Sequence, residues 1–295
     1  MFFKKILPNF VYNYYKLKKQ ELTKKKLNEF PKYSKDHFLE FLISNFNINE
    51  GDTLLIHSST DKLNIDFSIT ELLEILLIAV GKNGNLVFPT YPQLPSHQFL
   101  LSGEVWNVKR SLSYTGMLSE VARRYKGSIR SIHPTKSVCA IGPDSHFLTS
   151  THQNSPYPYD YCSPYYKVME LNGKSIGIGV TSNYLSSTHI VDDYFKENFP
   201  VEPYIKELFN AKCINYNNDT LIVKTLAHNL KKMKFNIPQF FKKNINRDIA
   251  RDLSYNGMNF FVVESKRLFL RMVELAQKGI TIYPRYFYKL NRMFR

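Results

Sequence analysis

Apolar and polar positions alternate along the chain in blocks whose spacing predicts strands and helices in turn. Residues 53–57 (TLLIH) are almost continuously apolar, which is typical of a strand buried on both faces of a parallel sheet. A capping-box sequence at 68–71 then opens an apolar helix over 72–80, and Gly81 supplies its stop. Residues 85–88 form the next apolar strand, so this part of the chain predicts a right-handed strand–helix–strand unit.

The same spacings recur further along the chain. Helical spacing predicts a lysine-rich helix and three amphipathic ones over residues 11–30, 36–46, 115–125 and 265–277. Short apolar runs predict strands over residues 138–141 and 174–180, and weaker ones over 213–216 and 220–223. Stretches without regular spacing predict loops over residues 91–113 and 151–166, and we expect the second to be exposed at the rim of a site. The alternation of strands and helices predicts an α/β fold.

Candidate chemistry is concentrated in the stretch TSNYLSSTHIVDDY, directly after one of the predicted strands. We expect a helix to begin there, capped by Ser186 or Ser187. His189 lies three residues before Asp192 and four before Asp193, so either carboxylate can share its helical face. A carboxylate beside an imidazole fixes the tautomer and prepares the other ring nitrogen to take a proton. The same pattern also occurs at the start of surface helices, where acidic side chains suit the helix dipole.

Charge is distributed unevenly over the 295 residues, whose net charge is +15. Residues 1–30 hold eight lysines and two glutamates, and residues 278–295 hold five basic residues and no acid, so eleven of the fifteen charges lie at the ends. Interleaved aromatic and basic residues, as in YPRYFYKLNRMFR, suit an anionic membrane surface, although a solvated tail has the same composition. Nucleic acid would also suit these ends, but no helix-turn-helix, zinc-finger or RNA-binding signature accompanies them, so no nucleic-acid partner is expected.

Other features limit the classes of protein to be considered. The sequence has no apolar run long enough to span a bilayer, and its N-terminus does not resemble a signal peptide. Three cysteines lie far apart without a CxxC pair, at positions 139, 162 and 213, which indicates a reducing cytoplasm and no disulfide framework or zinc site. The absence of GxGxxG and of a Walker lysine motif argues against a dinucleotide fold and a P-loop NTPase.

Several segments together, in this order, resemble the antibiotic acetyltransferase family, whose best-known members acetylate the 3-amino group of aminoglycosides. The segments are GDTLLIHSS (51–59), GKNGNLVFPTY (81–91), YTGMLSEVARR (114–124), RSIHPTKSVCAIGP (130–143), CSPYYKV (162–168), LNGKSIGIGV (171–180) and SSTHIVDD (186–193). The resemblance covers roughly residues 36–280 and implies a central, mostly parallel sheet flanked by helices, distinct from the GNAT fold. It therefore predicts an acetyltransferase domain between a basic extension (1–35) and a basic aromatic tail (281–295).

The resemblance also implies a co-substrate and site residues. It implies acetyl-CoA as donor, no metal, and His189 with Asp192 as the catalytic pair. The family usually has glutamate at the second position, so Asp193 also remains a candidate. The CoA moiety is expected near His57, Ser58, Ser59, Ser131, His133 and Ser187. Lys136 occupies a position where many relatives have a histidine or a small residue, and no catalytic role is carried over to it.

The chemistry of acetyl transfer fits these residues. An amine must be neutral to attack a thioester, and a histidine can take its proton as the bond forms. The developing oxyanion requires N–H donors, which we expect from the Ser58–Ser59 turn or from the helix start at Ser186–Ser187. Direct transfer requires no enzyme nucleophile.

The acceptor is predicted from the residues between 86 and 200, which offer few clustered acids and many Tyr, Ser and Asn side chains. Polycationic aminoglycosides are expected to need an acidic cleft. The favoured acceptor is therefore a small-molecule amino sugar, nucleotide- or lipid-linked, in surface-polysaccharide biosynthesis, with the enzyme cytoplasmic and its basic ends at the inner face of the membrane. The alternatives are an aminoglycoside 3-N-acetyltransferase of antibiotic resistance and a non-catalytic or nucleic-acid-binding protein.

Overall fold

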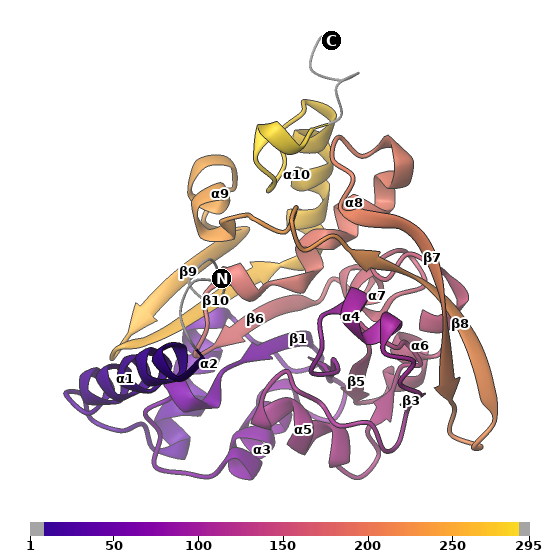
Figure 1. Ribbon diagram of the computed structural model, residues 1–295. Helices are drawn as coiled ribbons and strands as arrows, with labels where there is room; N and C mark the ends of the chain where they lie inside the picture. Colours follow the sequence, from indigo (N-terminus) through magenta and orange to yellow (C-terminus); the bar gives the residue numbers. More distant parts are fainter. Residues whose placement is uncertain (1–8, 289–295) are drawn as a thin grey trace.

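Strand β1 (Thr53–Ser58) lies in the middle of the larger sheet in the computed structural model, which describes residues 9–288 (Figure 1). Within those residues the sheet has seven strands, in the spatial order β4 (Ile129–Arg130), β5 (Val138–Ile141), β2 (Asn85–Pro89), β1, β6 (Lys174–Ile178), β10 (Met258–Glu264) and β9 (Ala250–Tyr255). Strand β1 is parallel to both neighbours, and the other pairings are antiparallel. The predicted α/β fold is confirmed, but the sheet is mixed and only its centre is parallel.

Helices cover both faces of this sheet because successive side chains of a strand point to opposite faces. Leu54 and Ile56 pack on one side, against α2 (Lys35–Phe46), α3 (Ile69–Val80) and α5 (Met117–Arg124). Leu55 packs on the other, against α6 (Ser145–Thr149), α7 (Pro164–Glu170), α8 (Ile190–Phe195) and α10 (Ser265–Gln277). Figure 1 shows α3 and α5 below the sheet and α8 and α10 above it.

Local sequence signals explain where these elements begin and end. The capping box before α3 is present, since Ser68 Oγ accepts the Glu71 N–H and Glu71 Oε2 accepts the Ser68 N–H. A Cβ on Gly177 would lie 2.1 Å from the Phe261 ring, so only glycine lets β10 pack this closely on β6. Gly179 turns the chain with φ +76, and a Cβ there would lie 2.4 Å from the Ser59 carbonyl. These glycines bring the segment after β6 beside the end of β1.

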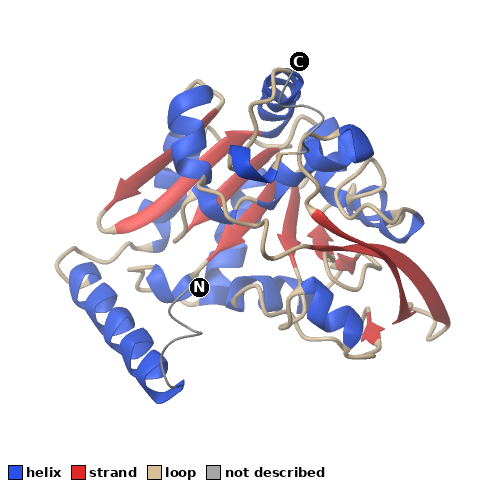
Figure 2. Cartoon of the chain, turned by 45° about the horizontal axis from the view of Figure 1, so that its top comes forward, coloured by secondary structure: helices blue, strands red, loops and turns tan. Residues whose placement is uncertain are grey.

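A smaller sheet is built from part of the segment predicted as a loop (91–113) and from two strands that begin before or extend beyond the weak strands predicted at 213–216 and 220–223. It consists of β3 (Trp106–Asn107), β7 (Tyr204–Ile214) and β8 (Thr220–His228), and α4 (Ser96–Leu101) packs on it. The long β7–β8 ribbon curves over one side of the molecule (Figure 2). The loop prediction for 91–113 was therefore wrong, because Trp106 is fully buried in a cluster with Cys213 and Val223.

The segment 151–166 was expected to be an exposed loop, and this prediction was wrong for its aromatic part. Tyr159 and Tyr165 are buried, and α7 already begins at Pro164. Both rings pack beneath the segment that follows β6, where they contact each other with ring centroids 4.8 Å apart. The spacing of residues along the sequence could not predict this burial, because the contacting residues come from distant parts of the chain.

The folded part of the chain extends beyond both predicted domain boundaries, at residues 36 and 280. Helix α1 (Asn9–Leu27) ends at Leu27, which is buried in the core and whose carbonyl accepts a hydrogen bond from the Asn64 side chain. At the other end, Ile282 and Tyr283 are buried and Tyr288 pairs with Val201. Residues 281–288 therefore belong to the folded domain, and the rest of the predicted tail lies outside the described residues.

Two further elements complete the fold and bear on membrane contact. Helix α9 (Ile237–Asn244) packs beside β9, and a short 3-10 turn, Arg285–Phe287, follows α10. Within residues 9–288 no helix is both long and apolar enough to cross a membrane. Helix α1 exposes Tyr14, Leu17 and Leu22 among its lysines, and its contact with an anionic membrane stays a prediction.

Candidate functional site

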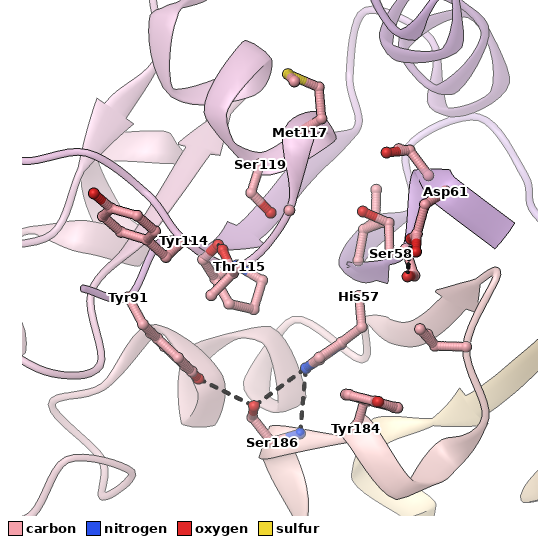
Figure 3. A pocket seen from close by; sticks show the side chains of 16 residues that line it. His57, Ser58, Asp61, Tyr91, Tyr114, Thr115, Met117, Ser119, Tyr184 and Ser186 are labelled. Atoms are coloured by element: carbon pink, nitrogen blue, oxygen red, sulfur yellow. Dashed lines mark hydrogen bonds between the residues drawn. The ribbon is translucent and has the colours of Figure 1, made fainter. Parts of the chain in front are cut away.

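A cavity of about 460 Å³ opens at the carboxyl end of β1, where ligands settle in open α/β sheets (Figure 3). It is lined by side chains from β1, from the first turn of α5 and from the segment after β6, namely His57, Ser58, Ser59, Asp61, Tyr91, Tyr114, Thr115, Gly116, Met117, Ser119, Tyr184 and Ser186. The turn after β1 and the segment after β6 thus meet at one site. Asp61 is the one carboxylate among these described lining residues, so the cavity is polar without being strongly acidic.

His57 is a neutral hydrogen-bonding group in this cavity. Its Nε2 accepts the Ser186 N–H at 3.2 Å and lies 3.2 Å from Ser186 Oγ. The Tyr91 hydroxyl donates to the same Oγ (Figure 3). The ring proton is therefore placed on Nδ1, which is buried and unpaired within the described part of the chain, as is Ser58 Oγ. Burial lowers the pKa of His57 to about 3, because no carboxylate compensates the lost hydration.

The serines predicted around this cavity differ in their roles. Ser59 Oγ donates to Asp61 at 2.5 Å, and its N–H donates to the Ile178 carbonyl at 3.0 Å. Ser186 lines the cavity, whereas Ser187 points to Ser175 with the two Oγ atoms 3.4 Å apart. Ser186 rather than Ser187 therefore lines the cavity, since successive side chains of a 3-10 turn point in different directions, and contact of Ser187 with CoA stays a prediction. The N–H groups of Ser59 and Ser186, expected to hold an oxyanion, are already paired.

Ser131 and His133 do not reach the cavity. Both are fully buried, with Ser131 Oγ 2.8 Å from His152 Nδ1 and His133 Nε2 3.2 Å from Thr225 Oγ1. His133 Nδ1 accepts the backbone N–H of Lys136 at 3.0 Å. Burial lowers the pKa of His133 well below its usual range. These side chains stabilise the turn that carries Lys136, and their contact with CoA stays a prediction.

His189 and Asp192 form a buried pair on the short turn Ser186–His189 and the start of α8. The distance from His189 Nδ1 to Asp192 Oδ2 is 2.8 Å, and the same oxygen accepts the Tyr283 hydroxyl at 2.5 Å. Burial raises the pKa of Asp192, and the hydrogen bonds from His189 and Tyr283 act in the opposite direction. This arrangement holds the imidazole in one orientation and leaves Nε2 available for chemistry.

Asp193, the other candidate partner, points away from His189. Its oxygens accept the Tyr159 N–H at 2.7 Å and the Tyr204 hydroxyl at 2.6 Å. Burial raises its pKa well above the usual range for a carboxyl. Asp192 is therefore the carboxylate beside His189, and Asp193 ties α8 to the 151–166 segment and to β7.

Two residues that the sequence did not single out belong to the same cluster. His228, at the end of β8, lies with its ring centroid 4.9 Å from that of His189 and 4.7 Å from that of Tyr204. Tyr283 comes from the segment predicted to be a tail without a chemical role. No local motif marks either residue. Each contacts His189 although it lies 39 or more positions away from it in the sequence.

Comparison with known proteins decides the family. The sequence model described as aminoglycoside 3-N-acetyltransferase matches residues 55–274, well over half of the chain. The chain belongs to this family. Aminoglycoside N(3)-acetyltransferase IV from Salmonella sp. is 27% identical over 171 residues, which cover 58% of this chain and 63% of the relative. Aminoglycoside N(3)-acetyltransferase III from Enterobacter cloacae is 23% identical over 164 residues, covering 51% and 57%. The chain thus matches less than two thirds of these relatives' length.

Solved structures show the same fold over more of the chain. Aminoglycoside acetyltransferase AAC(3)-Xa superimposes with a TM-score of 0.73 and 14% identity, covering 89% of this chain and 98% of the other. AAC-IIIb, solved as a binary complex with CoASH, gives 0.70 with 14% identity and coverage of 84% and 98%. AAC-VIa, solved with sisomicin bound, gives 0.70 with 18% identity and coverage of 84% and 99%. The fold implied by the resemblance is confirmed.

Proposed function

We propose that the chain is an acetyl-CoA-dependent N-acetyltransferase that uses His189 as general base. The observation that carries the proposal is the buried His189–Asp192 pair, which does not itself line the cavity but follows three residues after the cavity-lining Ser186. Membership of the family, and the complex of the related AAC-IIIb with CoASH, support acetyl-CoA as donor. No metal is required by this chemistry.

The cavity suits the acetyl-thioester donor in two ways. Helix α5 begins at Met117 after Gly116, which gives no side-chain cap, and Gly116, Met117 and Ser119 line the cavity, so an anion such as phosphate would be favoured at this helix start. The unpaired His57 Nδ1–H and Ser58 hydroxyl offer hydrogen bonds to a carbonyl oxygen. These two groups replace the paired backbone N–H groups that the sequence suggested as oxyanion donors, and their bonds strengthen as negative charge develops.

Proton transfer is assigned to His189. The acceptor nitrogen attacks the thioester carbon, the new C–N bond forms, and His189 Nε2 takes the proton that the nitrogen releases. Asp192 stabilises the resulting imidazolium through Nδ1–H, and Tyr283 fixes the carboxylate by donating to the same oxygen. The thiolate of CoA then leaves and is protonated from His189 or from solvent.

For the acceptor, the comparisons favour the alternative interpretation over the one preferred from the sequence. The relatives are named as aminoglycoside 3-N-acetyltransferases, and AAC-VIa binds sisomicin, so an aminoglycoside or related amino sugar is the proposed acceptor class. A role in surface-polysaccharide biosynthesis has no support among them.

A binding and turnover experiment tests this function. Calorimetry is expected to show acetyl-CoA binding, and thiol release is expected when aminoglycosides or simple amino sugars are added. The absence of binding at millimolar acetyl-CoA would contradict the donor assignment. Binding without thiol release for any amine would contradict the catalytic assignment and favour a non-catalytic protein.

A further inference from the structure

Lys136 differs from the other lysines that the structure buries. Lys174 Nζ donates to the Asn47 carbonyl and to Asp52, and Lys167 Nζ donates to the Phe147 carbonyl. The Lys136 ammonium is half-buried, and within residues 9–288 no carbonyl or carboxylate pairs with it. A partly buried cation has lost some of its hydration, so an anion from outside the chain would be favoured beside it.

Aromatic rings hold this ammonium between the cavity and the catalytic pair. Its nitrogen lies 4.7 Å from the centroid of the Tyr91 ring and 6.0 Å from that of Tyr159. Tyr91 lines the cavity and directs its hydroxyl towards Ser186 (Figure 3). The Tyr159 ring, in turn, packs against His189 with centroids 5.4 Å apart. Lys136 is therefore placed between the cavity-lining Tyr91 and the Tyr159 ring that packs against His189.

His228 provides a second, independent observation at the same place. It is 3% exposed, and its Nε2 is buried with no partner in the described chain. Burial lowers its pKa well below the usual range, and the charge of Lys136 acts in the same direction, so the ring is neutral and close to that charge. In the tautomer protonated at Nε2, His228 donates one hydrogen bond.

The nearby carboxylates accept from other donors and none is paired with Lys136 in the described residues, although Asp192 Oδ1 is buried without a partner. Asp192 accepts from His189 and Tyr283, and Asp193 accepts from Tyr159 and Tyr204. Burial lowers the pKa of Lys136 to about 8, as expected for an ammonium that lacks a counter-charge.

We propose that Lys136 and His228 form a subsite for an anionic group, a carboxylate or a phosphate, carried by the acceptor close to its amine. This inference rests on the proposed acetyltransferase function and restricts its acceptor. A polycationic aminoglycoside brings no anion to Lys136, so it is expected to be turned over more slowly than an amino sugar whose phosphate or carboxylate supplies a partner. The phosphates of CoA do not fit this position, because the pantetheine arm separates them from the thioester that must face His189.

The test compares acceptors that differ in one charged group. Glucosamine, glucosamine 6-phosphate, muramic acid and kanamycin are assayed by thiol release from acetyl-CoA. The wild type is expected to prefer one of the two anionic sugars over glucosamine by about 10- to 100-fold in kcat/KM, the usual worth of hydrogen bonds to charged groups. Phosphate and carboxylate are distinguished by which of the two sugars is preferred. Kanamycin turnover equal to or above that of both anionic sugars would overturn the inference while leaving the acetyltransferase function intact.

Variants identify the residue responsible. Lys136→Met is expected to abolish the preference for the anionic sugar while the KM for acetyl-CoA stays within about threefold. Lys62→Met is the matched control, since this lysine also lies over a cavity-lining tyrosine, Tyr184, with 5.7 Å between Nζ and the ring centroid. An unchanged preference in Lys136→Met, or a loss confined to CoA affinity, would contradict the subsite.

A binding measurement keeps the inference testable if no sugar is turned over. Calorimetry of glucosamine 6-phosphate and of muramic acid is performed on the protein saturated with CoA, for the wild type and both variants. The wild type and Lys62→Met are expected to bind one of the two sugars about 10-fold or more tightly than Lys136→Met does. Equal binding by all three proteins, or no binding by the wild type, would overturn the inference.

Discussion

His57 and His189 are both buried histidines beside the carboxyl ends of the central strands, yet their surroundings give them different chemistry. His57 accepts hydrogen bonds from Ser186 and has no carboxylate next to it, and burial lowers its pKa to about 3. His189 has Asp192 at 2.8 Å. Since burial disfavours an imidazolium unless a counter-charge is present, position near a cavity does not by itself make a base. The carboxylate decides which histidine can take a proton.

The largest effect is expected when that base is removed. His189→Ala should lower kcat by about 10²–10⁴, the usual contribution of a positioned proton transfer, and should leave acetyl-CoA affinity nearly unchanged. His57→Gln should lower kcat to a smaller extent, because His57 is proposed to donate to the developing oxyanion without taking the proton. Steady-state kinetics at saturating acceptor measure both. A His189→Ala enzyme within a few-fold of wild type would remove His189 from the mechanism.

Exchanging the two neighbouring carboxylates tests the partner. Asp192→Asn keeps the shape but loses the charge that stabilises the imidazolium, so kcat should fall by about 10- to 100-fold. Asp193→Asn is the matched control, since its contacts to Tyr159 and Tyr204 are structural, and it should lower the melting temperature more than kcat. If Asp193→Asn were the more damaging change to kcat, the assignment of the pair would have to be reversed.

The neutral state of His57 predicts a contribution to acid sensitivity. Its pKa falls from 6.5 to about 3 on folding, so the unfolded chain binds the extra proton as pH drops below 6.5, and stability is lost in that direction. Between pH 7.5 and 5.5 this amounts to about 1.4 kcal/mol in the free energy of unfolding. Urea titrations of wild type and His57→Gln should differ in their pH dependence by that amount. Parallel curves would mean that the pKa of His57 is the same in the folded and the unfolded chain.

The smallest effect is expected at Tyr283. Its hydroxyl donates to Asp192, and Tyr283→Phe removes this one hydrogen bond while keeping the ring packing. A loss of about 0.5–1.5 kcal/mol corresponds to a kcat reduced by about 2- to 10-fold. The KM for acetyl-CoA serves as the control and should not change. A wild-type kcat in Tyr283→Phe would leave this residue with a packing role alone.

The parts of this picture that could be predicted from sequence are those encoded locally. The strand at 53–58, the capped helix at 69–80 and the His189–Asp192 spacing all depend on neighbours within one or two turns. Spacing could not decide between Asp192 and Asp193, because both offsets suit one helical face and the choice depends on Tyr159, Tyr204 and Tyr283.

The parts that could not be predicted depend on contacts between distant segments. His228 reaches the site because β8 pairs along the length of β7. Lys136 becomes significant only because, within residues 9–288, it contacts aromatic rings and no carboxylate pairs with it. Ser131 and His133 looked like ligands because they occur in a family motif near a strand. Their burial with His152 and Thr225 assigns them to the turn that presents Lys136.

The most direct test of the central claim is the pH dependence of kcat/KM for the wild type, His57→Gln and His189→Ala with one acceptor. The account predicts that the wild-type rate rises with pH through the titration of one enzyme group. This limb should persist in His57→Gln and disappear in His189→Ala, once the titration of the free acceptor amine has been subtracted. Persistence of the limb in His189→Ala, with its loss in His57→Gln, would show that the base is the histidine without a carboxylate and would contradict the account.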